Sequence, residues 1–151
     1  MGGDRGGNQA SGETERLGGL SAMEEEFRAL LTTSSAVMAL VAPANINWGE
    51  VPQGARPPAI ALHLIDNVDG LTQQGPDGLW QGRVQVDVYD LTFGGATIVA
   101  RAVRDVLHGY RAGGFRLISL SQQRSNKNQQ AVDRPYWISM DFITNWRNAN
   151  A

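Results

Sequence analysis

Hydrophobic and polar residues alternate strictly in the segment from Arg83 to Tyr89. A period of two residues is typical of a strand that buries one face, and it predicts a strand over residues 80–90. The apolar face consists of Val84, Val86 and Val88. The opposite, polar face is formed by Arg83, Gln85, Asp87 and Tyr89. This strand should therefore separate a hydrophobic core from a second, polar surface.

The pattern changes to a helical period after Gly94 and Gly95. Apolar residues then recur at helical spacing, which predicts an amphipathic helix over residues 93–108. The apolar stripe comprises Ala96, Val99, Ala100, Val103, Val106 and Leu107. His108 lies at the C-terminal end of this helix, where an imidazolium interacts favourably with the helix dipole.

An earlier helix is predicted to begin at Met23, with Ser21 as its N-cap and Glu24 as the capping-box partner. Hydroxyl side chains at residues 32–35 compete for backbone hydrogen bonds, so we expect a break there and a second helical piece over residues 36–41. The next segment holds three prolines and two glycines, and it is predicted to be a structured loop over residues 46–58.

Three more strands are predicted over residues 59–65, 115–120 and 136–146. The element order is then α-β-β-α-β-β, an α+β fold in which two helical segments cover one face of a four-stranded, mainly antiparallel sheet. We expect a single domain over residues 23–151 and a disordered or arm-like extension over residues 1–22. The predicted core comprises Phe27, Leu30, Leu31, Ile60, Leu62, Val84, Val86, Val88, Val99, Val103, Leu107, Ile138 and Met140.

Two predicted connections between strands, residues 66–79 and 121–134, are longer than ordinary hairpin loops. They are either extended hairpin arms that order against a neighbouring subunit or mobile loops without a function. The sequence pattern leaves both interpretations open.

Composition and charge narrow the class of protein. The chain has no cysteine, which excludes disulfides and thiolate chemistry. No apolar run is long enough for a membrane helix, and the N-terminus lacks the apolar stretch of a signal peptide, so a soluble cytoplasmic product is expected. Residues 1–100 contain 5 Lys and Arg against 12 Asp and Glu, whereas residues 101–151 contain 8 against 3. This split is either chance or a sign that identical subunits associate head to tail, acidic surface on basic surface.

The sequence contains no recognisable catalytic or metal-binding motif. His63 lies in an apolar strand, where we expect a satisfied core or interface histidine. Asp87 and Asp90 fall on opposite sides of one strand, which does not suit shared acid–base chemistry. The glycine pairs form no nucleotide-binding motif, and the aspartates of residues 66–77 do not match a calcium loop. We therefore expect no enzyme, no metal and no cofactor.

Aromatic residues of the sheet leave one other class of function open. Tyr89, Trp137 and Trp146 could form a stacking platform for single-stranded nucleic acid, or the exposed face of the sheet could hold a small ligand. The chain has a single lysine and no RNA-binding aromatic motif, which favours the core or a subunit interface for these side chains.

Five segments follow one another in an order that resembles a known family. They are an Ala- and Leu-rich helix (23–41), a Gly-x-Val-Pro-Gln turn (49–53) leading through Pro58, an Arg-Val-Gln-Val-Asp strand (83–87), an Ala-rich helix (96–107) and an aromatic strand (136–146). In this order and spacing, residues 23–146 resemble the tail-completion, or tail-terminator, proteins of long-tailed bacteriophages and gene transfer agents.

The resemblance implies a structural virion protein without catalysis. It implies a ring of six subunits that ends tail-tube polymerisation and presents a surface to the head–tail connector. The expected partners are other copies of the chain, the tail tube protein and the connector, with no membrane and with DNA passing through without specific binding. The expected location is the head–tail junction of the virion, after assembly in the bacterial cytoplasm.

Two groups of candidate functional residues follow. The interface candidates are Trp48, Pro52 and Gln53 near the proline-rich loop and Arg101, Arg104, Arg116 and Arg124 in the basic third of the chain. A polar or acidic lumen lets DNA slide, whereas a basic lumen retains it through phosphate contacts. The lumen-facing candidates are therefore Gln85, Asp87 and Asp90.

Overall fold

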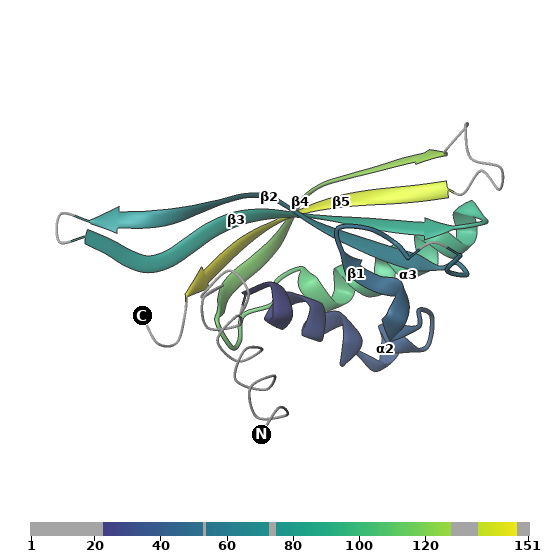
Figure 1. Ribbon diagram of the computed structural model, residues 1–151, viewed down its shortest axis with the longest axis horizontal. Coiled ribbons are helices and arrows are strands. Elements are labelled where there is room, and N and C mark those ends of the chain that lie inside the picture. Colours follow the sequence, from purple (N-terminus) through teal and green to yellow (C-terminus); the bar gives the residue numbers. More distant parts are fainter. Residues whose placement is uncertain (1–22, 53, 73–74, 128–135, 148–151) are drawn as a thin grey trace, which may run out of the picture.

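The protein folds into a five-stranded sheet whose strand order is β1-β2-β3-β5-β4. This computed structural model describes residues 23–52, 54–72, 75–127 and 136–147. The described helices lie on one side of the sheet (Figure 1). The predicted α+β class is confirmed, and the sheet has one strand more than the sequence predicted.

The bounds of the elements are as follows. The strands are β1 (Ile46–Trp48), β2 (Ala59–Thr72), β3 (Gly75–Asp90), β4 (Phe115–Lys127) and β5 (Tyr136–Arg147). The helical elements are a first helix over residues 23–32, α2 (Ser35–Met38), the 3-10 turn η1 (Pro43–Asn45) and α3 (Phe93–Leu107).

The additional strand, β1, lies in the segment predicted to be a loop. It pairs in parallel with β2, with Ile46 opposite Ile60. Arg28 of the first helix donates a hydrogen bond from its Nε to the Ile46 carbonyl at 2.8 Å, which anchors the strand beneath that helix. Three residues are too few to show an alternating pattern. The prolines and glycines that follow them are typical of a loop, which is why the sequence did not predict this strand.

The two long connections are largely strand rather than loop. Pairing of β2 with β3 continues to Thr72 opposite Gly75, and pairing of β4 with β5 continues to Lys127 opposite Tyr136. These extensions are the hairpin arms of the first interpretation, and Figure 1 shows that they point in opposite directions. Residues 73–74 and 128–135 lie outside the described part of the chain. Polar residues can form these strands because the two strands of each arm pair with each other beyond the core.

The ends of the helices follow local capping rules. The Ser34 hydroxyl accepts a hydrogen bond from the Val37 amide and so starts α2, which confirms the predicted break. The Thr92 hydroxyl accepts from the Gly95 amide at the start of α3. The chain leaves α3 through Gly109, whose φ of 84° favours glycine. The predicted cap at Ser21 lies outside the described residues.

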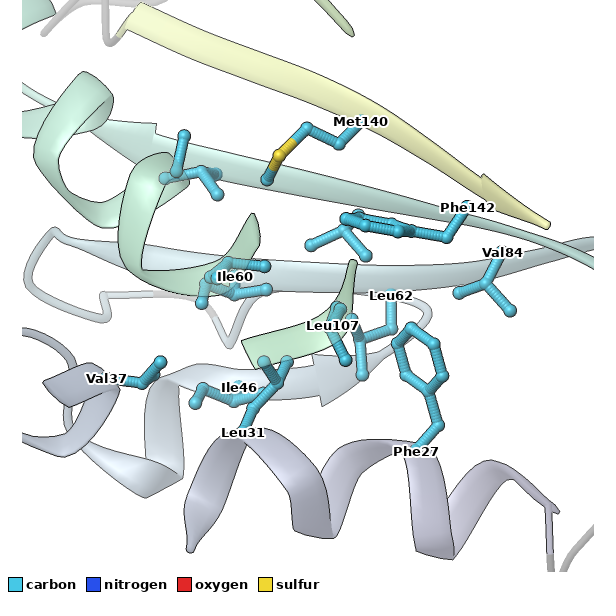
Figure 2. Packing of buried hydrophobic residues seen from close by; sticks show 14 of the residues in the cluster. Phe27, Leu31, Val37, Ile46, Ile60, Leu62, Val84, Leu107, Met140 and Phe142 are labelled. Carbon is cyan, nitrogen blue, oxygen red and sulfur yellow. The ribbon is translucent and has the colours of Figure 1, made fainter. Parts of the chain in front are cut away.

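The hydrophobic core lies between the helices and one face of the sheet (Figure 2). The side chains of Val84, Val86 and Val88 are fully buried on this face. Every residue of the predicted core is buried except Leu30, which is partly buried and packs against it. The alternation seen in the sequence is therefore the division between the core and the opposite face.

A partly buried contact connects the first helix to β4 and β5. The Glu26 carboxylate accepts hydrogen bonds from the Gly114 amide at 2.7 Å and from the Trp146 indole Nε1 at 3.0 Å. A Cβ on Gly114 would collide with that indole nitrogen, so the close approach requires glycine. Glu26 thereby joins the start of β4 to the end of β5.

Replacing Leu107 by alanine should lower the free energy of unfolding by about 2–5 kcal/mol, because its side chain is fully buried at the end of α3. Ile98→Ala on the same helix is the matched control, since Ile98 is 55% exposed, and it should change stability by less than about 0.5 kcal/mol. Denaturant titration of both variants measures the difference. Equal effects would contradict this assignment of the buried stripe.

Candidate functional site

The face of the sheet opposite the helices carries a network of polar side chains. Asp87 and Asp141 are each 7% exposed and Ser139 is 4% exposed, although no described helix covers this face. Their burial comes from neighbouring side chains on the sheet itself. Buried carboxylates are costly unless they are paired or hydrogen-bonded, so their partners determine what this face can do.

Asp87 of β3 is held by three neighbours. The Ser139 hydroxyl donates to its Oδ1, and the Gln85 Nε2 donates to both carboxylate oxygens at 2.9 and 3.1 Å. The His63 Nε2 lies 3.3 Å from its Oδ2. His63 is thus a satisfied histidine, as predicted. A carboxylate with this many partners is poorly placed to act as a free general base.

Asp141 of β5 pairs with two arginines. Its Oδ2 lies 3.2 Å from Arg124 Nη1 and 3.7 Å from Arg83 Nη1. Arg124 also reaches the Gln85 Oε1 at 3.4 Å, which connects this pair to Asp87. The Asp141 Oδ1 is buried and accepts no hydrogen bond from the described residues.

Four strands contribute to the network because their registers align. His63 of β2 is opposite Gln85 of β3, which is opposite Asp141 of β5, and Arg124 of β4 is opposite Ser139 of β5. Two carboxylates are balanced by two guanidinium groups, and His63 adds charge only when it is protonated. The row is thus nearly neutral and its formal charges are paired within the subunit.

Two aromatic side chains border the network. Tyr89 and Trp137 meet edge to face, with ring centroids 6.3 Å apart. Burial, together with the nearby charge of Asp87, raises the pKa of Tyr89 above its ordinary value. Trp146 is 3% exposed within the core on the other face, a position that the sequence favoured, so the alternative platform does not include it.

The lumen-facing candidates lie in two different parts of the structure. Gln85 and Asp87 belong to the network, whereas the Asp90 Oδ1 accepts a hydrogen bond from the Leu91 amide near the start of α3. Arg83, Ser139 and Asp141 were not singled out in the sequence. The alternation of β3 and β5 placed them on the polar face, but only the strand register shows that they meet.

The interface candidates differ in their surroundings. Trp48 is half-buried, packs against Phe27 and donates from its Nε1 to the Glu24 carbonyl, so it contributes to the fold. Arg124 belongs to the polar network. Exposed positions are occupied by Pro52, Arg101, Arg104 and Arg116, and Gln53 lies outside the described residues.

Metal sites and membrane helices are absent from the described ranges. No group of three or more His, Cys, Asp or Glu side chains in those ranges could hold a metal ion. Nor is any described helix long and apolar enough to cross a membrane.

Comparison with known proteins agrees with this architecture. A solved chain from the virion of a native gene transfer agent particle superposes with a TM-score of 0.65 at 19% sequence identity, covering 81% of this chain and 92% of that one. Comparison with curated proteins yields no match. Residues 25–145 match the model of the family described as tail completion protein gp17. Because that match spans most of the chain, this protein belongs to the tail completion protein gp17 family.

Proposed function

We propose that the protein forms a ring of six subunits that caps the tail tube, ends its polymerisation and joins the tail to the head connector. Membership of the tail completion family supports a role in the tail. The fold likeness to a chain of a gene transfer agent virion is consistent with it. The protein acts by shape and surface, without a catalytic step.

The observation that carries this proposal is the charge-balanced face of the sheet. DNA is retained by Lys and Arg side chains that are free to contact phosphates. Arg83 and Arg124 are instead directed at Asp141, and Asp87 adds a negative charge beside them. Such a face suits the wall of a channel through which DNA slides. Gln85 and Asp87 are the lumen-facing residues in this arrangement.

The exposed loop before β2 suits a docking surface for the tube or the connector. Asn45 fixes it by donating from its Nδ2 to the Arg56 carbonyl at 2.8 Å and to the Pro58 carbonyl at 3.3 Å. A loop that is already ordered loses less entropy when it binds. Pro52 belongs to this surface, and Arg101, Arg104 and Arg116 are candidates for contacts between subunits.

One alternative retains a structural basis. The Tyr89–Trp137 pair lies on the polar face and could stack with a base of single-stranded nucleic acid. Trp146 does not lie on this face, which weakens the alternative because only one aromatic pair remains there.

The purified full-length protein should form rings, measured by light scattering and seen by negative-stain electron microscopy. In an assembly reaction without it, tubes should vary in length and heads should remain unjoined, and its addition should restore both. A monomer that shifts on adding an oligonucleotide would contradict the ring and support the alternative. Normal joined tails in its absence would contradict the proposed role in tail completion.

Replacing Gln85 by lysine should make assembled rings retain duplex DNA, because the change gives the otherwise charge-balanced face one net positive charge per subunit. The retention should decrease as salt rises, as measured by fluorescence anisotropy at several salt concentrations. Gln123→Lys makes the same change at an exposed position opposite Met140, away from the network, and should have little effect. Equal retention by both variants would show that the Gln85 face does not line the channel.

A further inference from the structure

Two exposed apolar surfaces of the subunit are unlike each other. The first, here called the groove, lies between α2 and α3, with a volume of about 500 Å³. Leu40 and Ile98, which are 36% and 55% exposed, line it together with small aliphatic side chains. Arg101 and Asp105 of α3 are exposed and lie beside these apolar residues.

The second surface lies on the β2–β3 hairpin. This arm, residues 65–72 and 75–82, begins at a β-bulge between Leu64 and Asp66. Ile65 is 51% exposed and Val68 is 64% exposed. Asp66 is also exposed and lies between them in the sequence. The arm therefore combines aliphatic side chains with an acidic one.

The two surfaces are complementary in charge. The segment 65–82, which includes the arm, has three aspartates and no lysine or arginine. Arg101 and Asp105 line the groove, and α3 exposes Arg104 as well, so the exposed side of this helix carries two arginines against one aspartate. An aliphatic and acidic arm thus matches an aliphatic groove on a helix with a small excess of positive charge. The arm thus belongs to the acidic first part of the sequence, and Arg101 and Arg104 belong to its basic last part.

We propose that the arm of one subunit docks in the groove of a second copy of this chain. Figure 1 shows the arm extending away from the end of the molecule where α2 lies, so it does not fold back on its own groove. Two different surfaces that join copies make a head-to-tail contact, which closes into a ring when the rotation between subunits permits it. The inference rests on the proposed ring and assigns its subunit contact.

Within this contact the residues have distinct roles. Ile65 and Val68 lose water as they meet Leu40 and Ile98, which provides the attraction. Asp66 pairs with Arg101 and fixes how far the arm enters the groove. Because exposed charge pairs are screened by salt, the association should weaken at high ionic strength but not disappear.

The first test introduces a charge into either surface of the full-length protein. Val68→Glu on the arm and Ile98→Glu in the groove should each weaken ring formation by about tenfold or more, because a carboxylate would lose its water among aliphatic side chains while Arg101 is already paired with Asp66. Leu91→Glu is the matched control, since Leu91 is 52% exposed outside both surfaces. Sedimentation velocity of the three variants measures ring formation. Rings that persist in both Val68→Glu and Ile98→Glu would overturn the contact.

The second test exchanges the two charges. Asp66→Arg and Arg101→Asp should each shift the association constant by about tenfold, and the double variant should recover most of the loss because the pair is restored with opposite signs. Arg111→Glu, at an exposed position after α3, controls for the change in net charge. Additive losses in the double variant would show that Asp66 and Arg101 do not meet.

The third test uses the absence of cysteine from the chain. A protein carrying Val68→Cys together with Ile98→Cys or Leu40→Cys should give a ladder of disulfide-linked oligomers after mild oxidation. Each single variant should yield dimers at most. Wild-type rings without such a ladder would overturn the contact while the ring proposal stands, and the groove would be left to the tube protein or the connector. A wild type that forms no ring would instead contradict the proposed function.

Discussion

The alternation of side chains along β3 is the constraint on which the rest of the structure depends. β3 lies between β2 and β5, so both of its edges are hydrogen-bonded and its side chains lie on the two faces of the sheet. One face carries three fully buried valines, and the other carries the residues that surround Asp87. A slip of one residue would exchange these faces and place Asp87 in the hydrophobic core. The hydrophobic core and the polar network therefore fix the same register.

This division could be predicted from the sequence because it is local. The valine face, the helical stripe of α3 and the break near Ser34 all follow from the identities of neighbouring residues, and the structure confirms them. Features that depend on distant partners could not be predicted. The contacts of Glu26 with Gly114 and Trp146 join residues that are far apart in the sequence, and no local pattern marks them.

The two polar segments between the predicted strands left two interpretations open, hairpin arms or mobile loops. They contain few residues that a core needs, and their backbones are paired in long hairpins, so only pairing with distant residues decides between the two. The same limit applies to the candidate site. Gln85 and Asp87 could be named from one strand, whereas Arg83, Ser139 and Asp141 join them through the register of three strands. Trp146 lies on the core face instead, because it is an even number of residues along β5 from the buried Met140 and Phe142.

As a member of the tail completion family, the protein is a structural component of the virion tail. Its structure divides the requirements of that role between surfaces. The helices and the valine face stabilise the subunit, Arg83 and Arg124 pair with Asp141 on the opposite face, and the arms extend beyond the core. This separation allows assembly contacts to form without disturbing the core, because the exposed residues of the arm contribute little to it.

A cryo-electron microscopy reconstruction of the particle at the head–tail junction would test the central claim most directly. The account predicts a ring of this chain at the end of the tail tube, with Gln85 and Asp87 facing the channel and the helices facing outward. A ring in which the helices that cover the valine face line the channel would contradict the account. So would a particle in which the chain is absent from this junction.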